Sequence, residues 1–152
     1  MTGQATRGEC HADPALIHRA VFVLVYDDER GRILWQEWSF SKDVNPGWWV
    51  TSVSGHVNAG ESNEEAAVRE TGEEIGVDLP VELLGTFLYR YPTETECSAV
   101  FRAVSSGPFN YHRDEISSVE FMTVAEILRR EREGRLKLSP AVHRIIDSLS
   151  LD

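Results

Sequence analysis

Six glutamates lie between residues 61 and 74, and their carboxylates could together bind a divalent cation. They occupy positions 61, 64, 65, 70, 73 and 74, with Arg69 among them. On a helix with 3.6 residues per turn, Glu70, Glu73 and Glu74 share one face. Such carboxylates repel one another unless a hard cation such as Mg²⁺ neutralises them. The alternative is a solvated acidic face without chemistry, which carboxylate runs on helices often form.

The segment 61–76 has the end signals of a helix that could hold these carboxylates in place. Ser62 and Glu65 have the spacing of a capping box, and Gly76 is a suitable stop. Arg69 precedes Glu73 by four residues and can pair with it. The remaining face carries Val68, Thr71 and Ile75, which we expect to pack on a sheet.

Short apolar and β-branched runs predict the sheet. The expected strands are 20–26, 32–37, 49–53, 81–90, 96–104 and 118–122, the first two forming a hairpin. Two further helices are expected, one from Thr123 to Gly134 and one that starts at Ser139 and Pro140. This order predicts an α/β fold in which helices cover both faces of a mixed sheet.

The 152 residues and their charge limit the classes of partner. Hydrophobic residues make up 41% and the formal net charge is -10, which fits one globular domain over 10–152 with a flexible tail over 1–9. A negative surface repels duplex nucleic acid and anionic membranes. We therefore expect a small-molecule partner, and a monomer or a homodimer.

The low number of cysteines and the lack of a long apolar run predict a cytoplasmic protein. The two cysteines, Cys10 and Cys97, do not make a disulfide scaffold. No apolar run approaches the ~20 residues that a membrane helix needs, and residues 1–9 lack the apolar centre of a signal peptide.

A set of fixed positions around the acidic helix resembles the Nudix box. A glycine, a glutamate and the run R-E-x-x-E-E-x-G-V occur in the required spacing, at Gly55, Glu61, Arg69, Glu70, Glu73, Glu74 and Gly76. The resemblance implies an α/β/α sandwich and a hydrolase of organic diphosphates. It also implies Mg²⁺ or Mn²⁺ on Glu70, Glu73 and Glu74, with Arg69 and Glu61 orienting the helix. Thr71 departs from the family pattern, which usually has an apolar residue there.

Diphosphate hydrolysis also needs a base for the attacking water, and a carboxylate can serve. Glu74 is the first candidate, with Glu115 and Glu96 as alternatives.

The run NPGWWVTSVSGHVNAGESNEEA resembles, within the Nudix fold, the type 1 isopentenyl-diphosphate isomerases. The resemblance implies a second, transition-metal site for Mn²⁺, Fe²⁺ or Zn²⁺ on residues His11, His18, His56, Glu94 and Glu96. Ser54 stands where those isomerases have a catalytic cysteine, and a hydroxyl is a much weaker acid than a thiol. The resemblance therefore favours hydrolysis over isomerisation. The plain alternative is that these histidines and glutamates are only solvated or packed.

All four tryptophans lie between Trp35 and Trp49. Trp38 or Trp48 could line a substrate pocket together with Ser54, although such clusters more often belong to the core. Phosphate contacts could come from Lys42, Arg90, Arg102 or Arg113. Three functions are therefore weighed: a hydrolase, an isomerase and a non-catalytic binding module.

Overall fold

The computed structural model describes residues 17–27, 31–42, 46–90, 92 and 95–151. Its strands are β1 (Ile17–Tyr26), β2 (Ile33–Trp38), β3 (Trp49–Val50), β4 (Val53–His56), β5 (Glu82–Arg90), β6 (Thr95–Val104) and β7 (Ile116–Met122). Its helices are α2 (Asn63–Ile75), α3 (Val124–Arg132) and α4 (Pro140–Leu149). The predicted tail, His11, Cys10 and Glu94 lie outside the described residues.

The strands form one mixed sheet in the order β3-β2-β1-β6-β5, with β4 paired to β1 and β7 paired to β2. β1 runs parallel to β6, and the other pairs are antiparallel. β2 pairs with β1 only at Tyr26 and Ile33, and β4 takes its place beside Ala20–Val23. The sheet therefore opens between β1 and β2, and β4 lies in this opening.

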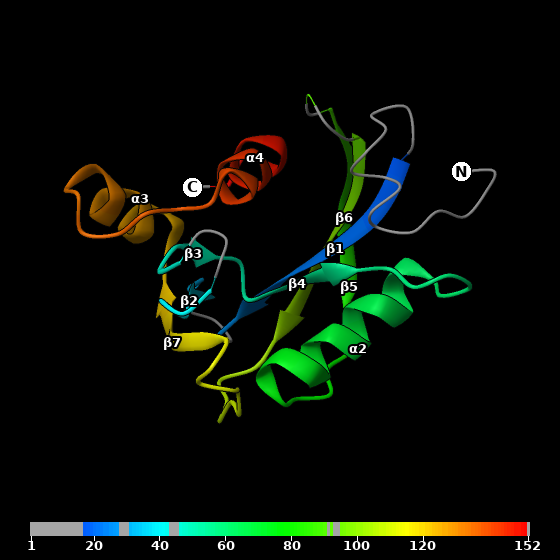
Figure 1. Cartoon of the computed structure of the whole chain (residues 1–152), viewed down its shortest axis with the longest axis horizontal. Helices are drawn as coiled ribbons and strands as arrows, with labels where there is room; N and C mark the ends of the chain where they lie inside the picture. Colours follow the sequence, from blue (N-terminus) through cyan, green and yellow to red (C-terminus); the bar gives the residue numbers. More distant parts are fainter. Residues whose placement is uncertain (1–16, 28–30, 43–45, 91, 93–94, 152) are drawn as a thin grey trace.

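Alternating residues of β1 build two separate cores. Ala20, Phe22 and Leu24 pack with residues of α3 and α4, whereas Val21, Val23 and Val25 pack with α2. Figure 1 shows α2 on one side of the sheet and α4 on the other. This arrangement confirms the predicted α/β fold with helices on both faces.

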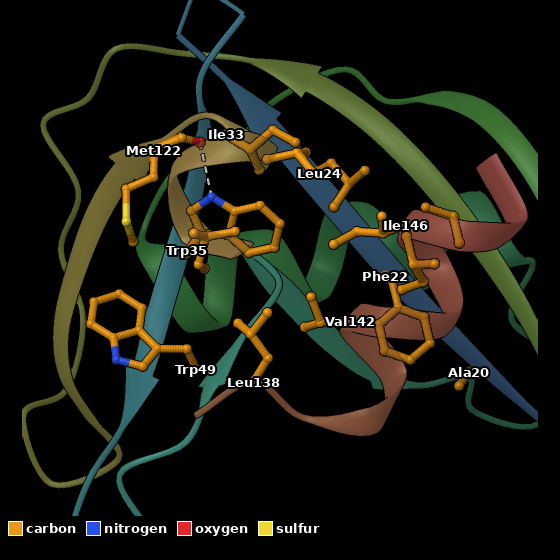
Figure 2. Close-up of a cluster of buried hydrophobic side chains, with 14 residues drawn as sticks. Ala20, Phe22, Leu24, Ile33, Trp35, Trp49, Met122, Leu138, Val142 and Ile146 are labelled. Carbon is orange, nitrogen blue, oxygen red and sulfur yellow. Dashed lines mark hydrogen bonds between the residues drawn. The ribbon is translucent and has the colours of Figure 1, made fainter. Parts of the chain in front are cut away.

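The core under α4 includes Trp35 and Trp49, which are both buried (Figure 2). The indole nitrogen of Trp35 donates to the carbonyl oxygen of Met122 over 3.0 Å, so its one polar group is satisfied. These two tryptophans are therefore structural.

Helix α2 has the predicted ends. Ser62 and Glu65 form the capping box, and Gly76 adopts the left-handed conformation with φ of 73°. Thr71 is fully buried, and its hydroxyl donates to the Ala67 carbonyl over 2.7 Å. Thr71 is thus accommodated on the packing face without an unsatisfied polar group.

The expected division of α2 into an acidic and an apolar face is wrong in part. Ala66 and Ala67 are fully buried, while Val68 is only half-buried. The face of α2 that packs on the sheet is therefore rotated, relative to the expected one, toward the carboxylates. As a result, the side of the helix with Glu70 and Glu74 lies against the sheet.

The single strand expected over 49–53 is also corrected, because β3 and β4 are separated at Thr51 and Ser52. The buried Ser52 hydroxyl donates to the Leu34 carbonyl and accepts from the Val25 amide over 2.9 Å. Ser52 thus connects β1 and β2 at the point where they separate, which interrupts the strand. In the described part of the chain, no helix is both long and apolar enough to cross a membrane.

Candidate functional site

Arg69 joins helix α2 to the loop that precedes it. Its guanidinium donates to both carboxylate oxygens of Glu61, over 2.8 and 3.0 Å, and to the His56 carbonyl over 3.0 Å. This two-pronged ion pair lowers the pKa of Glu61 and raises that of Arg69. The arrangement has the geometry of the helix-orienting role expected for these two residues.

The same guanidinium contacts two of the three candidate metal ligands. It donates to Glu70 over 2.8 Å and to Glu73 over 3.3 Å, the latter being the expected i, i+4 pair. The Glu73 side chain is otherwise largely exposed. Arg69 thus neutralises part of the carboxylate cluster when no cation is present.

Glu70 approaches β4 at a glycine. Gly55 pairs with Val21 and lies on the face of the sheet that α2 covers. A Cβ atom on Gly55 would stand 2.5 Å from Oε1 of Glu70. The missing side chain therefore creates the space that the carboxylate occupies.

Glu74 lies deeper than the other two carboxylates. Its Oε1 accepts from Nε2 of Gln36 over 3.1 Å, and the Ser54 backbone also donates to it. Burial, together with the neighbouring Glu70, raises the pKa of Glu74 from 4.5 to about 8, although the bonds from Gln36 and Ser54 oppose the rise. A carboxyl in this setting favours either a proton or a cation.

The three carboxylates line a cavity of about 520 Å³. Its other walls include Gln36, Trp38, Lys42, Ser54, His112 and Glu115. The sequence interpretation missed Gln36 and His112 as site residues. Gln36 had a usable signal, since a polar residue in an otherwise buried strand needs a partner, whereas His112 had none.

The donor set suits a hard divalent cation, because all three side chains offer carboxylate oxygens. The depth of Glu74 also fits a bound cation, because a buried carboxylate needs a compensating positive charge. In the described part of the chain, no three His, Cys, Asp or Glu side chains already converge as ligands. Two of the three carboxylates contact Arg69 instead.

A second cluster lies on the opposite face of the sheet. His18, Ser54 and His56 share the face of Ala20 and Phe22, and Glu96 stands beside His18 in the parallel pair. Nε2 of His18 lies 3.2 Å from Glu96, and the rings of His18 and His56 are 5.3 Å apart. Ser98, which the sequence interpretation missed, donates to the other Glu96 oxygen over 2.6 Å. The structure thus places three of the five candidate ligands of the second metal site near one another, but within the described residues they do not form a ready group of metal ligands.

Ser54 lies between the two clusters. Among the described strands β4 pairs with β1 alone. The other edge of β4 therefore has no strand beside it and borders the cavities. Ser54 and Trp38 line both the carboxylate cavity and a neighbouring one of about 600 Å³ that includes His56 and Glu96.

Of the residues predicted to contact phosphate or to line the substrate pocket, some line these two cavities and others do not. Lys42 lines both and lies 4.7 Å from the ring centre of Trp38. Trp48 lines neither, and Lys137 covers its ring at 5.1 Å. Arg90, Arg102 and Arg113 also lie outside the linings of both cavities.

The NUDIX domain model matches residues 16–142. The chain belongs to the Nudix family. The match spans both clusters and the helix with the carboxylates, so the Nudix box sits in the structural context that the motif requires.

Relatives with 35–37% sequence identity carry two different names. An isopentenyl-diphosphate Delta-isomerase of Streptomyces avermitilis is 35% identical over 136 residues, covering 84% of this chain and 68% of the relative. The uncharacterized Nudix hydrolase YfcD of Escherichia coli is 37% identical over 128 residues, covering 84% and 70%. Both resemblances expected from the sequence are therefore confirmed.

A solved structure agrees with the fold. The crystal structure of DR0079 from Deinococcus radiodurans matches with a TM-score of 0.74 and 27% identity, covering 95% of this chain and 90% of that one. Together with the family model, these similarities place the chain among the Nudix hydrolases.

Proposed function

We propose that this Nudix protein hydrolyses the diphosphate bond of a small organic diphosphate with the help of Mg²⁺ or Mn²⁺. The observation that supports it most is the carboxylate cavity, which is lined by Glu70, Glu73 and Glu74 together with Lys42. An ammonium in the same cavity as a cation-binding group suits a substrate with several phosphate charges. The net charge of -10 does not prevent the binding of such a substrate, because the bound cations would lie between the phosphates and the acidic helix.

Each residue has a distinct task in this proposal. Glu70, Glu73 and Glu74 would hold the cation, which supplies charge neutralisation and a more acidic water. Arg69 and Glu61 fix the helix on the loop, so that the carboxylates keep their positions. Lys42 would contact the phosphates.

The positions of the three candidate bases support Glu74 or Glu115 over Glu96. Glu115 lines the carboxylate cavity together with Glu74. Glu96 lies outside that lining, on the other face of the sheet, and is engaged by His18 and Ser98. We therefore propose Glu74, with Glu115 as the alternative, as the group that takes the proton from the attacking water.

The test is turnover of a panel of organic diphosphates by the purified protein, with Mg²⁺, with Mn²⁺ and with EDTA. We expect hydrolysis of at least one compound that EDTA abolishes. Reaction in ¹⁸O-labelled water should place the label on one phosphate product. A protein that turns over no member of the panel with either metal would contradict the proposal.

A second candidate function rests on the cluster of His18, His56 and Glu96. Imidazole and carboxylate together suit a transition metal, and a relative with 35% identity is named as an isopentenyl-diphosphate Delta-isomerase. Ser54 weakens this candidate, because isomerisation needs an acid that can protonate carbon. Proton NMR of isopentenyl diphosphate in D₂O distinguishes the two functions. We expect no deuterium incorporation by the wild type, and incorporation would establish the isomerase.

A further inference from the structure

A third cavity lies between the sheet and the start of α4. It measures about 310 Å³ and has apolar walls that include Phe22, Val50 and Val142. Ser54 and Trp38 line this cavity and also the carboxylate cavity. One molecule can therefore extend past Ser54 from the carboxylates to α4.

The first turn of α4 faces this cavity with polar groups. Ser139, the N-cap residue, lines the cavity, is only 7% exposed and makes no capping hydrogen bond. Within the described residues its hydroxyl has no other hydrogen-bond partner either. An N-cap serine normally accepts a bond from the helix, whereas this hydroxyl faces the cavity instead. It can therefore bond to a group that enters the cavity.

Two further groups favour an anion at this point. Ala141 lines the cavity and is the second residue of α4, where an N–H has no acceptor within the helix. Arg144, one turn later on the same side, also lines the cavity. Its guanidinium lies 5.8 Å from the ring centre of Tyr89, whose hydroxyl is 3.0 Å from Ser148 Oγ. The positive charge is thus held at the cavity wall.

Glu96 is the acidic residue of this cavity lining. Its two oxygens are engaged by His18 and Ser98, on strands β1 and β6. An anion would avoid that end of the cavity and bind at the α4 end.

We infer that the organic part of the substrate occupies this cavity and carries a second anionic group, a carboxylate or a phosphate monoester. Ser139, the start of α4 and Arg144 bind that group, while Phe22, Val50 and Val142 contact apolar atoms between it and the diphosphate. A volume of about 310 Å³ is near the lower end for ligand pockets, so the organic part is compact. The inference rests on the proposed function, which places the diphosphate at the carboxylates.

Three probes test this subsite. Isopentenyl diphosphate has no second anion, mevalonate 5-diphosphate has a carboxylate, and 5-phosphoribosyl 1-diphosphate has a phosphate monoester. Affinities are measured by calorimetry with Ca²⁺ in place of Mg²⁺, so that turnover does not interfere. We expect one of the two anionic probes to bind at least about tenfold more tightly than isopentenyl diphosphate. The preferred probe identifies the anion as carboxylate or phosphate.

The variant Arg144→Gln should lose this preference and bind isopentenyl diphosphate as the wild type does. Arg144→Lys should retain part of the preference, because it keeps the charge. Arg135→Gln, which makes the same charge change on an arginine outside the cavity lining, should behave like the wild type. Equal affinity for all probes, no binding of the anionic probes, or an equal loss for all probes in Arg144→Gln would overturn the inference.

The same proteins are then assayed for hydrolysis with Mg²⁺. A binding preference without turnover of any diphosphate would leave the anion subsite in place and contradict the proposed hydrolysis. Turnover without the binding preference would support the proposed hydrolysis and contradict the anion subsite.

Discussion

The backbone of Gly55 lies against the carboxylate of Glu70, so closely that a Cβ atom would be 2.5 Å from Oε1. The glycine is on strand β4 and the glutamate is on helix α2. This contact sets how near the acidic helix comes to the open edge of the sheet. It also explains in physical terms why the motif needs a glycine there.

The variant Gly55→Ala should therefore lose activity. Its methyl group pushes the Glu70 carboxylate away, and a misplacement of about 1 Å can cost roughly 100-fold in rate. Steady-state hydrolysis and Mg²⁺ titration measure the effect. The control is Gly72→Ala in the same helix, whose Cβ would meet nothing nearer than 3.9 Å. It should keep activity and gain about 0.5–1 kcal/mol of stability. Full activity in Gly55→Ala would show that the contact is unimportant.

The pKa of Glu74 predicts how the stability of the metal-free protein depends on pH. The folded carboxyl has a pKa of about 8 against 4.5 ordinarily, so between these values the folded state holds a proton that the unfolded state has lost. The raised pKa thus stabilises the fold fully below pH 4.5, and this contribution is lost as the pH rises toward 8. The slope from this group is at most about 1.4 kcal/mol per pH unit.

Urea unfolding in EDTA at several pH values between 5 and 9 measures this slope. Glu74→Gln removes the titrating group and keeps the shape, so its stability should fall less over the range and exceed that of the wild type above pH 8. Parallel stability curves for the two proteins would show that Glu74 ionises normally.

Arg69→Lys tests the connection between the loop and α2. An ammonium cannot reproduce the two-pronged bond to Glu61 together with the bond to the His56 carbonyl. We expect a loss of about 1–2 kcal/mol in the free energy of unfolding and a lower kcat. Arg129→Lys on the surface of α3, where the side chain is 46% exposed, should cost clearly less, because solvent screens exposed ion pairs. An equal loss in both variants would reduce the Arg69 contacts to ordinary surface ion pairs.

The sequence predicted those parts of the fold that depend on local signals. The capping box at Ser62, the stop at Gly76 and the apolar run of β1 were all visible, and they locate α2 and the buried central strand. The division of β1 between two cores was not predicted, because it depends on which helix covers each face of the sheet. The interruption at Ser52 could not be predicted, because it depends on bonds to Leu34 and Val25 in two other strands.

The candidate site was predictable to a similar extent. Motif spacing indicated the carboxylates, and their common cavity agrees with it. The rotation of α2 buries Glu74 against Gln36. This rotation depends on how the helix packs on the sheet, so the spacing of the glutamates could not predict it. Ser139 gave a helix start in the sequence, but only the structure shows its hydroxyl without a partner beside a cavity.

The most direct test of the central claim compares kcat for Mg²⁺-dependent diphosphate hydrolysis among the wild type, Glu74→Gln and Glu64→Gln. Glu64 is an exposed glutamate on the same helix that does not line the carboxylate cavity, so its variant matches the change in charge. We predict a loss of roughly 100-fold or more for Glu74→Gln and wild-type activity for Glu64→Gln. Equal kcat values for Glu74→Gln and the wild type would contradict the account.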